Sequence, residues 1–118
     1  MAVARVINDS GTPYFADYSG VINVNTVVSL INITVASGTT LKLSHLEISC
    51  RFESFIEVLK NGQVIADLRT GAANPSASFN WIPSRKLISG DIIQVNLQKR
   101  SGSPDVEVGA HLMGLSAP

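Results

Sequence analysis

The amino-acid sequence predicts an all-β fold, because three of its features favour strands over helices. No window has apolar residues recurring at three- and four-residue spacing over three turns, as an amphipathic helix requires. Runs that alternate between apolar and polar residues occur along the whole chain and are rich in β-branched residues. Short stretches of turn-forming residues separate these runs. A length of 118 residues suits one hydrophobic core, so we expect a single domain over residues 1–118.

The first third of the chain contains two predicted strands and one ambiguous stretch. A short strand over 3–7 leads into a loop over 8–13 that is built from turn-forming residues. Residues 14–24 carry aromatic side chains and fit either a strand or an arm, so 1–24 is a possible N-terminal arm. The stretch 27–36 is predicted to be a strand whose inward residues are Val27, Ile31, Ile33 and Val35.

The strand predicted over 40–52 changes phase near its middle. Leu41 and Leu43 share one parity, whereas the apolar residues that follow share the other: Leu46, Ile48, Cys50 and Phe52. One inserted residue near Ser44 and His45 would place both sets on the same face of a sheet. We therefore predict a β-bulge there.

The second half predicts a hairpin and three further strands. Asn61-Gly62 joins the strands 55–60 and 63–69, because a type I′ turn requires positive φ at both central positions. The inward residues of the three later strands are Ala77, Phe79 and Trp81, then Ile93, Val95 and Leu97, then Val106, Val108, Ala110 and Leu112. Pro83 is expected to end the first of these strands, and 114–118 to form a tail.

About eight strands around one core predict a jelly-roll-like antiparallel β-sandwich. An immunoglobulin-like sandwich is the alternative, although its Cys…Trp…Cys pattern is absent, since Cys50 is the only cysteine. Cys50 lies inside an apolar strand pattern and is expected to pack in the core.

The charge content is low for a soluble domain and favours assembly. Asp, Glu, Lys and Arg make up only 15% of the chain, against about 25% in typical soluble domains, and nine basic residues balance nine acidic ones. Net charge keeps neighbouring molecules apart, so a chain without it is protected best when other subunits cover its surface. A compact sandwich coated with Ser, Thr and Asn is the alternative explanation.

The same composition argues against several partners and compartments. Phosphate binding requires clustered Lys and Arg, which are missing, so we expect no nucleic-acid partner. No run approaches the roughly 18 apolar residues of a membrane helix, and the N-terminal residues lack the basic start and apolar stretch of a signal peptide. We expect a chain that is made in the cytoplasm and does not enter a membrane.

No constellation of residues indicates catalysis or a cofactor. His45 shares its strand face with Glu47, and His111 shares its face with Glu107 and Asp105, but two ligands do not make a stable metal site. The carboxylates are scattered over turns and outward faces, and the Gly-x-Ser-x-Gly nucleophile motif and phosphate-binding glycine loops are absent. We expect no enzyme, no metal and no cofactor.

The aromatic residues suggest two kinds of contact. Tyr14, Phe15 and Tyr18, together with Val21, lie outside the firmly predicted strands and are candidates for an interface with another subunit. Trp81 follows Phe79 and is expected to pack in or at the edge of the core, the alternative being a platform on which a sugar ring stacks.

The segment 56–115 combines a Leu-Lys-Asn-Gly hairpin, Leu87-Ile-Ser-Gly-Asp-Ile-Ile-Gln-Val95 and a last strand that ends in Leu112-Met-Gly-Leu115. It resembles the C-terminal half of trimeric jelly-roll heads of the complement and tumour necrosis factor type. It also resembles small accessory proteins of tailed-phage virions. The phage resemblance implies a non-enzymatic cement, decoration or tail protein in the virion, a homotrimer bound to major capsid or tail proteins. A carbohydrate-binding, lectin-like module is the alternative function.

Overall fold

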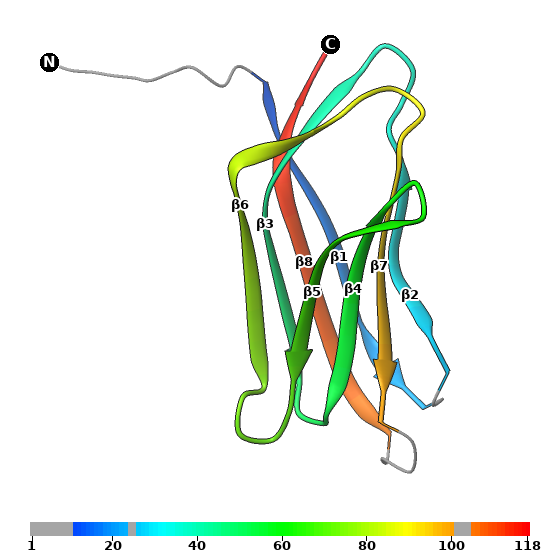
Figure 1. The fold of residues 1–118 in the computed structure, drawn as a ribbon, viewed down its shortest axis with the longest axis vertical. Coiled ribbons are helices and arrows are strands. Elements are labelled where there is room, and N and C mark those ends of the chain that lie inside the picture. The colour runs from blue at the N-terminus through cyan, green and yellow to red at the C-terminus, as the bar shows by residue number, and fades with distance from the viewer. Residues whose placement is uncertain (1–10, 24–25, 101–104) are drawn as a thin grey trace, which may run out of the picture.

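The computed structural model describes residues 11–23, 26–100 and 105–118, which form two four-stranded antiparallel sheets packed face to face (Figure 1). One sheet has the order β1-β8-β3-β6 and the other the order β2-β7-β4-β5. We call them the front sheet and the back sheet, names that do not refer to the view in Figure 1. The strands are β1 (Thr12–Ile22), β2 (Val28–Thr34), β3 (Thr40–Cys50), β4 (Ser54–Lys60), β5 (Gln63–Thr70), β6 (Ser76–Leu87), β7 (Ile92–Lys99) and β8 (Val106–Ala117). This order confirms the predicted jelly-roll sandwich. The strand predicted over 3–7 lies outside the described residues.

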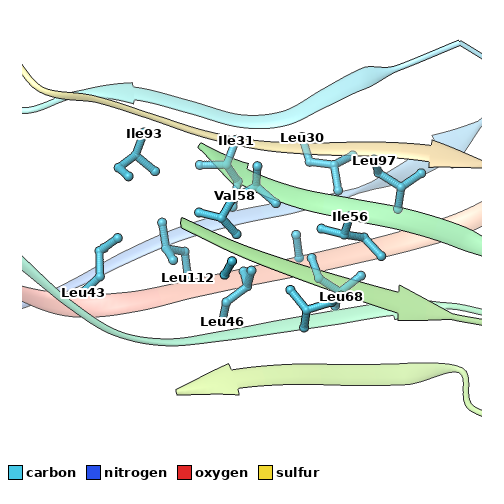
Figure 2. Packing of buried hydrophobic residues seen from close by; sticks show 14 of the residues in the cluster. Leu30, Ile31, Leu43, Leu46, Ile56, Val58, Leu68, Ile93, Leu97 and Leu112 are labelled. Atoms are coloured by element: carbon cyan, nitrogen blue, oxygen red, sulfur yellow. The ribbon is translucent and has the colours of Figure 1, made fainter. Parts of the chain in front are cut away.

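Alternate residues of both sheets point between them and form the hydrophobic core (Figure 2). Leu43, Leu46 and Leu112 of the front sheet, and Ile56 and Ile93 of the back sheet, are completely buried. The inward sets predicted for β7 and β8 are confirmed, since all of their members are buried. Each such aliphatic side chain stabilises the fold by about 1.5–3 kcal/mol through burial alone.

The predicted bulge in β3 is confirmed. The pairing of β3 with both of its neighbours shifts register between Leu43 and His45, so that Ser44 is the extra residue. As a result Leu43 and Leu46 are both buried, although their sequence parities differ. Ser44 is exposed, and its hydroxyl donates to the backbone carbonyl of Met113 over 3.3 Å.

The hairpin at Asn61-Gly62 is also confirmed, with φ values of 51° and 83°. The side-chain amide of Asn61 donates to Asp91 over 2.9 Å, and the other carboxylate oxygen of Asp91 accepts from the backbone N–H of Ile88 over 2.9 Å. The bond from Ile88, then the bond from Asn61 and the charge of Lys60, lower the pKa of Asp91. Asp91 therefore ties the β6–β7 turn to the β4–β5 hairpin, which gives the Leu87-Ile-Ser-Gly-Asp91 segment a structural role.

Residues 12–22 form a full strand, not a free arm. β1 pairs with β8 along its whole length, from Thr12 opposite Ser116 to Ile22 opposite Val106. The remainder of the possible arm falls mostly outside the described residues. Deleting residues 1–24 would therefore remove an edge strand of the front sheet.

Two other boundaries differ from the sequence prediction. Pro83 does not end β6, which continues to Leu87. Between Asn80 and Arg85 this edge strand has no partner residue in β3, so the missing N–H of Pro83 costs no ladder hydrogen bond. The expected tail over 114–118 belongs mainly to β8, because β1 and β3 flank that strand as far as Ser116 and Ala117.

The inward set predicted around β2 is wrong in part. Ile31 and Val35 are buried, but Val27 is 58% exposed, and Leu30 enters the core beside Ile31. A register shift between Ser29 and Ile31 causes this change of phase. Phe52, expected inward, follows the end of β3 and is 38% exposed.

We predict that Gly114→Ala destabilises the fold. A Cβ at Gly114 would collide with the backbone oxygen of Lys42 beside the bulge, and backbone cannot swing aside as a side-chain end can. The free energy of unfolding should fall by about 1–3 kcal/mol, as overpacked sites show. Gly71→Ala is the control, since a Cβ there meets nothing within 4 Å. Denaturant unfolding measures both, and equal stabilities would contradict the close approach.

Candidate functional site

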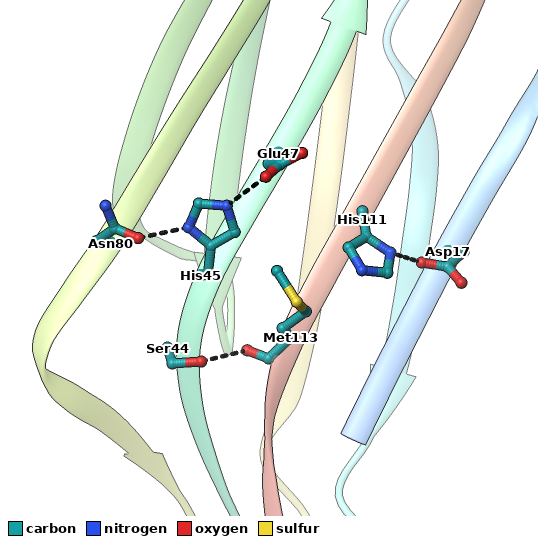
Figure 3. A network of polar contacts seen from close by, with 7 residues as sticks. All are labelled: Asp17, Ser44, His45, Glu47, Asn80, His111 and Met113. Atoms are coloured by element: carbon teal, nitrogen blue, oxygen red, sulfur yellow. Dashed lines mark hydrogen bonds and ion pairs between the residues drawn. The ribbon is translucent and has the colours of Figure 1, made fainter. Parts of the chain in front are cut away.

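The outer surface of the front sheet carries a network of polar contacts between side chains of β1, β8, β3 and β6 (Figure 3). We call the outward residues of β1, β8, β3 and β6 the front face. Strand pairing arranges them in three rows that cross the sheet. The rows are Phe15, Met113, His45 and Asn80, then Asp17, His111, Glu47 and Ser78, then Ser19, Gly109, Ser49 and Ser76.

The imidazole ring of His45 has a hydrogen-bond acceptor beside each of its two nitrogens. Its Nδ1 contacts the side-chain oxygen of Asn80 on β6, and its Nε2 contacts Glu47 on β3 at 2.9 Å. Both ring nitrogens therefore face acceptors, which favours the doubly protonated imidazolium. The hydrogen bond to Asn80, followed by the bond to and the charge of Glu47, raises the pKa of His45.

His111 forms a second pair on the same face. The expected carboxylates were those of its own strand, Glu107 and Asp105, but its Nδ1 contacts Asp17 of β1 instead. The ring of Phe15 stacks on His111 with centroids 5.7 Å apart and an interplanar angle of 18°. Strand pairing brings these residues together although 94 positions separate Asp17 from His111.

The row of small residues leaves a depression of about 530 Å³ in the front face. Gly109 and the hydroxyl residues Ser49, Ser76 and Ser78 line it, with Asp17, Glu47 and His111 also at its lining. A Cβ at Gly109 would approach the hydroxyl oxygen of Ser49 to 2.9 Å, so glycine helps to keep the depression open.

The structure divides the interface candidates between two sides of β1. Phe15 and Val21 point outward, and both are 56% exposed. Tyr14 and Tyr18 pack against the core, and burial raises the pKa of Tyr14. Of the four candidates, Phe15 and Val21 are the more exposed, while Tyr18 also lines the depression in the front face.

Trp81 belongs to the core side of β6. It is 8% exposed, and its ring meets Phe79 edge to face with centroids 5.0 Å apart. This burial confirms the core-packing prediction and leaves little of the ring for a sugar. Cys50 is buried as well, with its sulfur 3.3 Å from the hydroxyl of Ser54.

Sequence patterns could identify the pair His45 and Glu47, because both lie on one strand. They could not identify Asp17 or Asn80, since these partners come from β1 and β6 and depend on the pairing of distant strands. Within the described ranges no three His, Cys, Asp or Glu side chains are grouped so as to hold a metal ion. Nor does the described part of the chain contain a helix long and apolar enough to cross a membrane.

The chain matches no family model, no curated protein and no solved structure.

We predict that Asn80→Ala lowers the pKa of His45 toward the ordinary value of about 6.5. Because folding raises this pKa, the interaction stabilises the fold below that ordinary value, and the stabilisation is lost as the pH rises through the folded-state pKa. NMR titration of the His45 ring measures the shift, with Asn74→Ala as a control on an exposed turn. An unchanged His45 titration in Asn80→Ala would contradict the assignment.

Proposed function

We propose that the protein is a non-enzymatic assembly protein. It forms a homo-oligomer, specifically a trimer, through its front face. The observation that carries the proposal is the combination of exposed apolar residues and paired polar residues on one sheet surface. Phe15 and Val21 are 56% exposed, while the two histidines of the same face each pair with a carboxylate.

This combination lowers the cost of burying the front face. A polar group that enters an interface without a partner is expensive, whereas one that already has a partner keeps its hydrogen bond. The His45–Glu47 and His111–Asp17 contacts already give these four side chains partners within the face. A second copy of a chain with zero formal net charge therefore meets no overall repulsion.

A role in a larger particle accounts for the low charge content in the same way. A protein with 15% charged residues remains useful when neighbouring subunits cover its surface, and symmetric repetition adds many weak contacts together. We therefore extend the proposal to a component of a tailed-phage virion, a cement, decoration or tail accessory protein that contacts major capsid or tail proteins. Such a role requires the chain to be present in purified particles.

A lectin-like function centred on Trp81 is less well supported. The ring of Trp81 is 8% exposed and is engaged by Phe79, so it offers no broad stacking surface. Catalysis has no support from the front face, because its carboxylates pair with histidines and do not oppose one another across a cleft.

We predict that Val21→Glu dissociates the oligomer. The new carboxylate would lie opposite Glu107 on β8, and burying an unpaired charge costs more than the roughly 1.4 kcal/mol that corresponds to a tenfold loss of affinity. Light scattering coupled to gel filtration should show a multiple of 12.5 kDa for the wild type and the monomer mass for the variant.

Val64→Glu is the matched control. Val64 lies on β5 of the back sheet and is 49% exposed, close to the 56% of Val21. This variant should assemble like the wild type. A monomeric wild-type protein at high concentration, or equal dissociation of the two variants, would refute assembly through the front face.

A further inference from the structure

The outer surface of the back sheet differs in character from the front face. We call the outward residues of β7, β4 and β5 the back face. Strand pairing places Phe55 between Gln98 and Arg69, and in the next row Glu57 lies between Asn96 and Asp67. An aromatic ring is thus surrounded by planar polar side chains from three adjacent strands.

These residues line a groove of about 280 Å³, with Val27 also at its lining. Phe55 is 44% exposed, and the guanidinium of Arg69 lies 4.9 Å from the centre of its ring. The volume lies just below the roughly 300–1,000 Å³ of small-molecule pockets, so the groove suits a ligand of about one ring.

The polar groups of the groove lack partners, in contrast to those of the front face. Among the described residues, no hydrogen bond or ion pair engages the side chains of Glu57, Asp67 or Gln98. The side-chain oxygen of Asn96 is buried and has no hydrogen-bond partner among the described residues. Buried polar atoms in folded proteins nearly always have partners, so this oxygen is an acceptor that water or a ligand in the groove would satisfy.

We propose that this groove binds a neutral saccharide through Phe55, Glu57, Asp67, Asn96 and Gln98. Carboxylates accept hydrogen bonds from sugar hydroxyls, while amides both donate and accept. The guanidinium of Arg69 lies over the ring of Phe55, and the remaining exposed surface of this half-exposed ring offers apolar contact to the C–H groups of a pyranose. The groove contains two carboxylates and one guanidinium, and this excess of negative charge disfavours phosphorylated, sulfated or nucleic-acid ligands.

This inference goes beyond assembly and does not depend on it. The groove lies on the sheet opposite the front face, so an oligomer formed through the front face leaves it accessible. An assembled particle would then present one groove for each copy of the chain, and weak sugar binding would be strengthened by multivalency.

Titration of the ¹⁵N-labelled protein with lactose, maltotriose, cellotriose and chitotriose tests the proposal. At least one sugar should shift the amide resonances of β4, β5 and β7 around the groove at millimolar concentration. Phe55→Ala should weaken that binding about tenfold or more, and Asp67→Asn should weaken it as well. Phe52→Ala is the matched control, because Phe52 is 38% exposed outside the groove and its loss should leave binding unchanged.

Thermal unfolding of each variant establishes that the fold is retained. If none of the four sugars shifts a resonance at about 10 mM, the proposal is wrong, because that concentration would detect even weak binding with a Kd of about 1 mM. Binding that Phe55→Ala leaves intact, or shifts caused by trilysine and by no sugar, would also overturn it. Sugar binding by the monomeric Val21→Glu variant would show that the groove binds sugar whether or not the chain assembles.

Discussion

The extra residue at Ser44 in β3 is the constraint on which both surfaces of the front sheet depend. It lets Leu43 and Leu46 enter the same core, and it sets His45 and Glu47 on the outer face opposite Met113 and His111. Without the insertion, one half of β3 would turn its leucines to solvent, since a one-residue slip exchanges the two faces of a strand. Core packing and the polar rows of the front face therefore have the same structural origin.

The two outer surfaces of the sandwich have opposite hydrogen-bonding states. On the front face, His45 and His111 are paired with acceptors and two exposed apolar side chains flank them. On the back face, Glu57 and Asp67 face outward and have no hydrogen-bond or ion-pair partner within residues 11–23, 26–100 and 105–118. A face with paired polar groups is inexpensive to cover with protein, whereas a face with unpaired groups gains from a hydrogen-bonding ligand. We therefore propose assembly through the front face and ligand binding on the back face.

The sequence predicted the parts of the fold that depend on local chemistry. Asn61-Gly62 specifies its own turn, and the phase change between Leu43 and Leu46 specifies the bulge. Features that depend on partners from other strands could not be obtained in this way. The continuation of β6 past Pro83 requires a stretch without a ladder partner, which one strand's sequence does not reveal.

The candidate site was predictable only in part for the same reason. The pair His45 and Glu47 follows from strand parity, but Asp17 reaches His111 only through the register of β1 with β8. The pairing register of β1 could not be predicted, because the alternating pattern of residues 14–24 fits an arm as well as an edge strand. The surroundings of Phe55 could not be predicted either, since its neighbours Arg69 and Gln98 belong to two other strands.

Carbodiimide labelling of carboxylates in the assembled protein, read by mass spectrometry, tests most directly whether the two faces have different uses. Asp17 and Glu47 are both 62% exposed in the isolated chain, so only assembly would shield them. We predict that Asp17 and Glu47 are protected in the oligomer and become labelled when it dissociates, while Glu57 and Asp67 react equally in both states. Protection of Glu57 and Asp67 in place of Asp17 and Glu47 would contradict it.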